Sequence, residues 1–120
     1  MLDHVSINVS DLARSKTFYE QTFASIGYAV SFGEDGDMWA FDITDGLFEI
    51  IQSKNGGAVT PVHVAFRVAN KEQVHAFYEA AMAAGGKDNG APGPCPEYTL
   101  NYYACFVFDP DGNNIEAMVD

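Results

Sequence analysis

The chain has 120 residues and a mass of 13.0 kDa, which suits one compact domain and excludes a second catalytic domain. Hydrophobic residues make up 48% of it and charged residues 19%, so neither disorder nor a coiled coil is expected. Seventeen acidic against six basic side chains give a formal net charge of −11, which repels nucleic acid and anionic membranes. Without a long apolar run or a basic N-terminal flank, the sequence predicts a cytoplasmic protein that partners neither nucleic acid nor membrane.

The sequence repeats itself. When it is shifted by 59 residues, 8 of the 24 positions over 4–27 are identical, where composition alone would give roughly two. We therefore expect one domain over 1–120 that contains two copies of one unit, at 1–54 and 60–120. A glycine-rich stretch at 54–58 is the expected linker between them.

The first copy opens with a strand over 4–9, in which apolar and polar residues alternate. Ser10 and Asp11 can cap a helix whose apolar positions recur at helical spacing until Gly27 ends it. Three further strands are predicted, at 28–32, 38–43 and 47–53. The unit is therefore βαβββ.

The second copy follows the same order. A strand over 63–68 precedes a helix that begins with a capping box at Asn70 and Gln73 and stops at Gly85. A short strand at 86–88 leads into 89–96, which is rich in proline and glycine and is predicted as a loop. Two more strands are predicted at 102–108 and 114–119. The expected fold class is α+β, with two tandem βαβββ modules.

The side chains that could carry chemistry lie at equivalent places in the two copies. His4 and His63 both begin the repeated strand and share its polar side. Glu49 and Glu116 each stand among apolar residues in the last strand of a copy, where a carboxylate must find a partner. Each glutamate alternatively faces solvent from an edge strand or pairs with Arg67.

Two imidazoles and two carboxylates are nitrogen and oxygen donors that suit a divalent ion of zinc, nickel, cobalt, manganese or iron. Four ligands from His4, His63, Glu49 and Glu116 would leave positions for water or substrate. The two cysteines, Cys95 and Cys105, show no CxxC spacing and are expected as free thiols.

The chain resembles the vicinal oxygen chelate superfamily, which includes glyoxalase I, bleomycin-resistance and fosfomycin-resistance proteins and extradiol dioxygenases. The resemblance covers nearly the whole chain, and its most specific part is Asp-Pro-Asp-Gly-Asn-Asn-Ile-Glu at 109–116. It implies paired modules whose curved mixed sheets surround a cleft, and a divalent metal bound there. His4, His63 and Glu116 match the family's ligands, and Glu49 matches the fourth ligand of glyoxalase I. The family also implies a homodimer.

In such a cleft the ion would act as a Lewis acid on a small substrate chelated through two adjacent oxygens. Glu116 or Glu49 would be the general base of a glyoxalase-type lyase or isomerase. The candidate substrate-binding residues are Arg67, Ser6, Asn8, Trp39, Tyr102 and Tyr103. Two other functions stay open: a protein that binds a drug or metabolite without turnover, and a metal-dependent dioxygenase or thiol transferase that needs only three ligands.

Overall fold

The computed structural model describes residues 1–54 and 57–120, so part of the predicted linker at 54–58 lies outside the described residues. The first module contains β1 (His4–Val9), α1 (Leu12–Ala24), β2 (Val30–Glu34), β3 (Met38–Ile43) and β4 (Gly46–Gln52). The second contains β5 (His63–Arg67), α2 (Lys71–Ala83), β6 (Lys87–Pro94), β7 (Tyr103–Phe108) and β8 (Asn114–Val119). The predicted α+β fold with two tandem βαβββ modules is confirmed.

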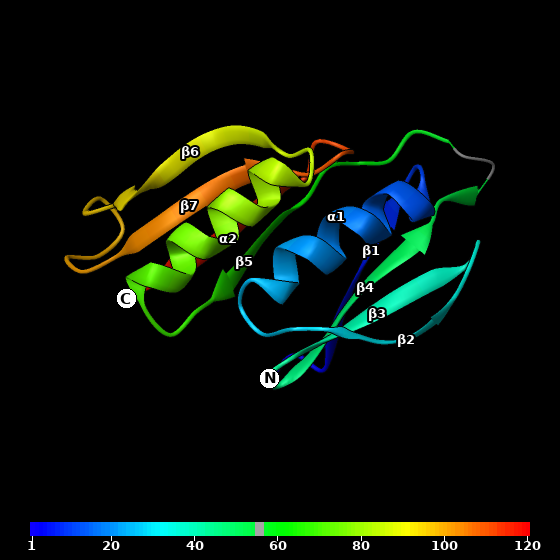
Figure 1. Cartoon of the computed structure of the whole chain (residues 1–120), viewed down its shortest axis with the longest axis horizontal. Coiled ribbons are helices and arrows are strands. Elements are labelled where there is room, and N and C mark those ends of the chain that lie inside the picture. The colour runs from blue at the N-terminus through cyan, green and yellow to red at the C-terminus, as the bar shows by residue number, and fades with distance from the viewer. Residues whose placement is uncertain (55–56) are drawn as a thin grey trace.

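Each module forms its own open sheet of four strands, in the orders β1-β4-β3-β2 and β5-β8-β7-β6. Both sheets are mixed, because the first strand of each module runs parallel to the last while the other neighbours are antiparallel. Figure 1 shows both helices on the viewer's side of the sheets, side by side along the middle of the molecule. Within the described residues, the opposite face of each sheet is therefore free of helices.

The helices begin where the sequence predicts. The Asp11 carboxylate accepts a hydrogen bond from the Arg14 backbone N–H at 3.1 Å, and the Asn70 side chain accepts one from Gln73 N–H at 2.9 Å. Gly27 leaves the first helix with φ +85°, a conformation that favours glycine. Neither α1 nor α2, the helices of the described residues, is long and apolar enough to cross a membrane.

Two predicted boundaries differ from the structure. The strand expected at 28–32 lies at Val30–Glu34, because the Tyr28 N–H still bonds to the Phe23 carbonyl in the turn that leaves α1. The loop expected at 89–96 is wrong over 89–94, which belongs to the edge strand β6. An edge strand tolerates proline, and two register shifts against β7 absorb the irregular residues.

One aromatic core joins the two modules. The Phe23 ring of α1 lies 5.0 Å from the Phe66 ring of β5, and the Phe48 ring of β4 lies 5.3 Å from the same ring. All three side chains are at most 5% exposed, and burying each contributes about 1.5–3 kcal/mol. The helix-bearing faces of both sheets are thus filled, which leaves the opposite faces for a site.

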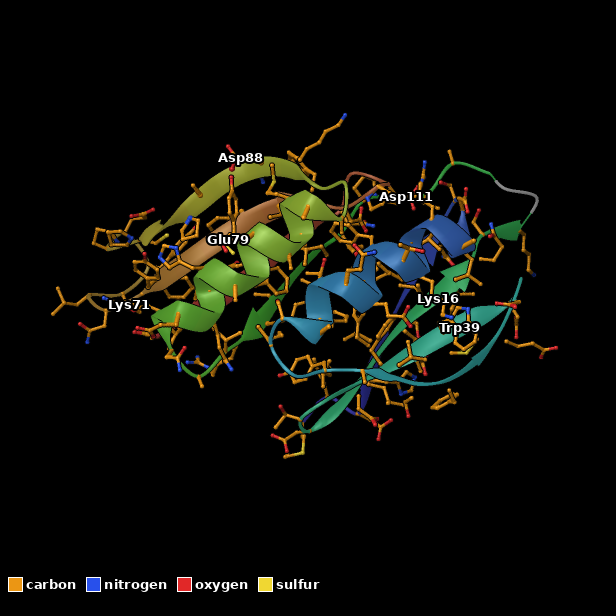
Figure 2. All side chains as sticks on the ribbon, in the orientation of Figure 1. Lys16, Trp39, Lys71, Glu79, Asp88 and Asp111 are labelled. Atoms are coloured by element: carbon orange, nitrogen blue, oxygen red, sulfur yellow. The ribbon has the colours of Figure 1, made fainter. Side chains whose placement is uncertain are left out.

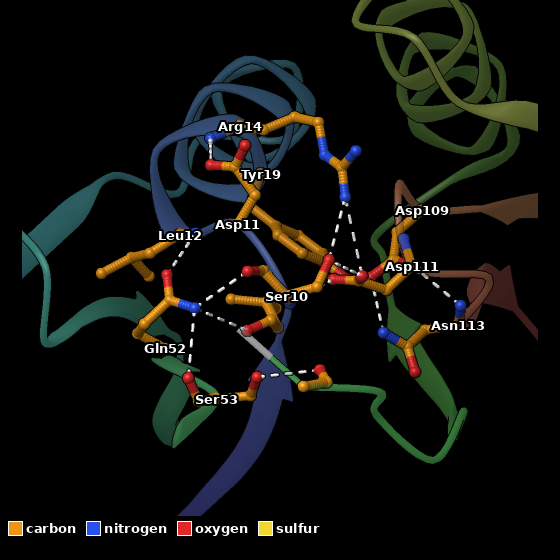
Figure 3. Close-up of polar contacts among 12 residues, drawn as sticks. Ser10, Asp11, Leu12, Arg14, Tyr19, Gln52, Ser53, Asp109, Asp111 and Asn113 are labelled. Atoms are coloured by element: carbon orange, nitrogen blue, oxygen red, sulfur yellow. Dashed lines mark hydrogen bonds and ion pairs between the residues drawn. The ribbon is translucent and has the colours of Figure 1, made fainter. Parts of the chain in front are cut away.

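A buried polar network also joins the modules at the turn between β7 and β8. The Tyr19 hydroxyl of α1 donates to Asp109 at 2.5 Å, and the Asn113 side-chain amide donates to the same carboxylate at 2.8 Å. Asn113 in turn accepts a hydrogen bond from the Val62 N–H at 2.8 Å, just before β5 begins. Figure 3 shows Asp111 beside these residues, where it accepts hydrogen bonds from the Ser10 backbone and hydroxyl.

The family-like segment 109–116 therefore has a structural role that its sequence does not show. Asp109 and Asn113, 4% and 1% exposed, hold the middle of α1 from one module against the residue just before β5 in the other. His63 is the next residue after Val62, so this network sets the place from which the second candidate histidine projects.

Candidate functional site

The candidate histidines lie on the helix-free faces of their sheets. His4, Ser6 and Asn8 of β1 are exposed, whereas Ile7 and Val9 are buried beneath α1. The same alternation in β5 exposes the residues at 63, 65 and 67 and buries Phe66. The predicted polar side of the repeated strand is confirmed in both modules.

His63 and Glu116 form the better-defined pair, which we call the C-terminal pair. The His63 Nε2 lies 2.9 Å from Glu116 Oε2, and the Tyr102 hydroxyl donates to the other oxygen, Oε1, at 2.5 Å. The Glu116 side chain is 3% exposed, whereas that of His63 is 51% exposed. Partial burial and the bond to Glu116 raise the pKa of the Tyr102 phenol.

His4 and Glu49 form the corresponding N-terminal pair. The Ser6 hydroxyl donates to Glu49 Oε2 at 2.6 Å, and His4 Nδ1 lies 2.7 Å from the Asp3 carboxylate. The bond to Asp3 and the nearby charge of Glu49 raise the pKa of the exposed His4 imidazole. Asp3 was not among the predicted site residues, although its place next to His4 in the sequence could have suggested it.

The two pairs occupy equivalent positions in their sheets. Glu49 stands opposite Ser6, two residues beyond the partner of His4, and Glu116 stands opposite Ala65, two residues beyond the partner of His63. The sequence obscures this equivalence, because Glu49 lies three residues after Gly46 while Glu116 lies four after Gly112. Both glutamates lie on central strands, so neither is the edge-strand residue that the alternative interpretation required.

The described residues of one chain do not bring the two pairs together. Across residues 1–54 and 57–120, no three histidine, cysteine, aspartate or glutamate side chains lie close enough to hold one ion. Each pair offers one imidazole nitrogen and one carboxylate oxygen, which is half of a four-ligand set. The four predicted ligands are thus arranged as two halves.

The predicted substrate-binding residues divide between the two faces. Ser6 and Asn8 line a hollow of about 600 Å³, and Arg67 lines another of about 270 Å³ beside Asp45. In the part of the chain that the structure describes, Arg67 takes part in no salt bridge, so the predicted pairing with a glutamate is not formed. Tyr102 reaches the C-terminal pair directly.

Trp39 and Tyr103 lie on the helix-bearing faces instead. Figure 2 shows Trp39 beside Lys16 of α1, whose ammonium lies 4.0 Å from the centre of the indole ring. The Tyr103 hydroxyl lies 2.7 Å from His75 Nε2 of α2. Side chains alternate along a strand, so these two residues point away from the histidine–glutamate pairs.

Comparison with known proteins agrees with the fold. The family model described as Glyoxalase/Bleomycin resistance protein/Dioxygenase superfamily matches residues 1–117. A comparison with curated proteins gives no match.

Solved structures superpose over the whole chain. A glyoxalase/bleomycin resistance protein from Albidiferax ferrireducens T118 is 29% identical, with 100% of this chain and 99% of that one covered and a TM-score of 0.89. A glyoxalase-related enzyme from Fulvimarina pelagi is 22% identical, with 100% and 88% covered and a TM-score of 0.80. A lactoylglutathione lyase from Agrobacterium tumefaciens is 18% identical, with 99% and 92% covered and a TM-score of 0.75. From the match over residues 1–117, the chain belongs to the glyoxalase/bleomycin resistance protein/dioxygenase superfamily.

Proposed function

We propose that the protein is a divalent-metal-dependent lyase or isomerase acting on a small substrate chelated through two adjacent oxygens. The observation that carries the proposal is the C-terminal pair, in which a buried carboxylate lies 2.9 Å from an exposed imidazole on a helix-free sheet face. Burying a charged carboxylate such as Glu116 beside a histidine adds little to the stability of the fold, because taking the charge out of water is costly even when it is paired. A functional role therefore explains the pair better than a structural one. The equivalent strand positions of the first module also hold a histidine and a glutamate, His4 and Glu49, which supports the same interpretation.

The residues fit a divalent ion. His63 Nε2 and Glu116 Oε2 lie 2.9 Å apart, so one ion with ligand distances of about 2.0–2.2 Å could contact both atoms. His4, His63, Glu49 and Glu116 together supply two nitrogens and two oxygens, a set that suits zinc, nickel, cobalt, manganese or iron. When bound, the ion would supply Lewis-acid polarisation of the substrate oxygens.

We further propose a homodimer in which each site takes the N-terminal pair of one chain and the C-terminal pair of the other. The support is that one chain presents two half-sets on helix-free faces, together with the dimerisation that the family resemblance implies. A two-fold axis that brings one such combination together necessarily brings the second together as well.

The glutamates are the candidate proton acceptors. Glu49 is partly exposed and accepts one hydrogen bond, from Ser6, so its carboxylate has the greater freedom to turn toward a substrate proton. Glu116 is buried between Tyr102 and His63 and is better suited to holding a fixed position. Arg67, exposed and on the same face, would attract an anionic group of the substrate.

Metal binding tests the proposal. We expect isothermal titration calorimetry and elemental analysis to find one transition-metal ion per chain, and His63→Ala or Glu116→Gln to abolish that binding. His75→Ala is the matched control, because this third histidine contacts Tyr103 on the helix-bearing face. A wild-type chain that takes up none of the five metals would overturn the proposal.

The second candidate is a protein that binds a small molecule without turnover, which the hollow of about 600 Å³ beside Ser6 and Asn8 favours. Such a protein would bind its ligand equally well before and after His63→Ala. Glu49→Gln separates the isomerase from a three-ligand dioxygenase or thiol transferase. It should abolish isomerase turnover, whereas a site built from His4, His63 and Glu116 would keep its metal and activity.

A further inference from the structure

The two pairs differ in the group that holds the carboxylate. In the N-terminal pair, Ser6 lies on β1 directly opposite Glu49 on β4, and its hydroxyl donates to Oε2 at 2.6 Å. In the C-terminal pair, the residue opposite Glu116 at the equivalent register is Ala65, which has no hydroxyl. The strand residue opposite Glu116 therefore cannot donate the hydrogen bond that Ser6 donates to Glu49.

Tyr102 supplies that hydrogen bond from a different element. It stands just before β7, and its hydroxyl donates to Glu116 Oε1 at 2.5 Å, while His63 Nε2 contacts Oε2 at 2.9 Å. The two oxygens of one carboxylate thus have different partners. Rotation of the carboxyl group would break both contacts, so the phenol and the imidazole together hold its plane in place.

The Tyr102 ring is itself held. The Tyr98 ring packs edge-on against it with centroids 5.1 Å apart, and the Tyr102 carbonyl accepts a hydrogen bond from Cys95 N–H at 2.8 Å. A donor fixed by ring packing and by its own backbone can orient another side chain at little cost in side-chain entropy.

We propose that Tyr102 is a positioning residue that takes over, for Glu116, the role that Ser6 has for Glu49. By occupying Oε1 it leaves Oε2 as the one oxygen presented to His63 and to an ion bound at the C-terminal pair. The metal-binding consequence rests on the proposed function, whereas the orientation of Glu116 is a property of the metal-free chain.

The metal-free chain provides the first measurement. At fixed neutral pH, the ¹⁵N chemical shifts of the His63 ring report which nitrogen contacts an acceptor. Tyr102→Phe keeps the ring and removes the hydroxyl, so the carboxylate can turn and the His63 shifts should move toward those of a solvent-exposed imidazole. Tyr98→Phe is the matched control and should leave them unchanged, because its side chain is largely exposed and reaches Tyr102 only through its ring.

The duplicated architecture provides a rescue. Serine at 65 would stand opposite Glu116 just as Ser6 stands opposite Glu49, and the site is exposed, so the extra hydroxyl has room. Tyr102→Phe combined with Ala65→Ser should therefore restore the wild-type His63 shifts. A residue that only stabilised the fold would not be replaced by a hydroxyl from another strand.

Zinc binding provides the second measurement. Removing a group that orients a ligand typically weakens metal binding about 10- to 100-fold, so Tyr102→Phe should weaken it by that range and the added serine should recover most of it. If wild-type protein binds no zinc while the His63 shifts respond as expected, the proposed function fails and the positioning role stands. Unchanged His63 shifts in Tyr102→Phe overturn the positioning role whether or not zinc binds. In wild-type protein the Tyr102 hydroxyl proton should exchange slowly with solvent, which tests the bond without any variant.

Discussion

Removal of the Tyr19 hydroxyl tests the polar network that joins the two modules. In Tyr19→Phe the ring keeps its contacts with Phe18, Phe23, Phe41 and Phe48, so the change removes little more than the hydrogen bond to Asp109. Tyr19 is 0% exposed and Asp109 is 4% exposed, so water does not readily replace the lost donor.

The magnitude follows from the acceptor's other partners. The Asp109 carboxylate still accepts hydrogen bonds from the backbone N–H groups of Asp111 and Asn113 and from the Asn113 side chain. One hydrogen bond to a charged group contributes about 1.5–3 kcal/mol, and we expect a loss of about 2 kcal/mol in the free energy of unfolding. Tyr28→Phe is the control, because its hydroxyl bonds to Thr44 Oγ1 at an exposed site and should cost under about 0.5 kcal/mol.

Urea unfolding followed by circular dichroism measures both variants against the wild type. If Tyr19→Phe loses no more stability than Tyr28→Phe, the buried hydrogen bond contributes no more than the exposed one, contrary to this prediction. The double variant Tyr19→Phe/Asp109→Asn gives a second check. Because the two residues are partners in one hydrogen bond, the double variant should lose less stability than the sum of the two single losses. A fully additive loss would contradict the prediction even if Tyr19→Phe alone costs about 2 kcal/mol.

Three further predictions concern the thiols and the edge strand. At pH 8 an alkylating reagent should label the half-buried Cys95 well before Cys105, because the Cys105 side chain is 0% exposed. Peptide mass spectrometry measures the two labelling rates, and equal rates would contradict the burial of Cys105. Burial raises the pKa of Cys105 from 9.0 to about 11, so only the unfolded chain ionises between these values and stability falls as pH rises. Relative to Cys105→Ala, the wild type should lose about 2 kcal/mol between pH 9 and 11, and parallel pH curves would refute this. Gly90→Ala should cost about 1–2 kcal/mol, because Gly90 has φ +147° and a Cβ there would lie 2.9 Å from Phe106, whereas Gly93→Ala meets only an atom at 3.8 Å and should be tolerated.

Local patterns predicted most of the fold. Alternation along 4–9 and 63–68 placed both histidines on the face that the structure leaves free of helices, because side-chain period is a property of the strand itself. The error at 89–94 has the opposite cause. Proline and glycine disfavour a strand locally, but pairing with β7 along one edge and two register shifts accommodate them.

The candidate site depends more on contacts between distant segments. The repeat predicts four candidate ligands at equivalent positions, yet it does not show how the two modules dock, and their separation into two pairs follows from that docking. The role of Tyr102 also escapes local patterns, because its hydroxyl reaches Glu116 across the sheet from outside the strand. Conversely, the aromatic character of Trp39 and Tyr103 suggests a substrate-binding role, but strand register places both residues beneath the helices.

A mixed dimer shows whether the metal site is shared between two chains. One chain carries His4→Ala and Glu49→Gln, the other carries His63→Ala and Glu116→Gln, and the two are co-expressed with different tags and purified as a pair. If each site combines the N-terminal pair of one chain with the C-terminal pair of its partner, the mixed dimer regains one intact site and binds one zinc ion per two chains, while neither variant binds zinc alone. A mixed dimer that binds no zinc, beside a wild-type protein that binds one ion per chain, would contradict a site shared between chains.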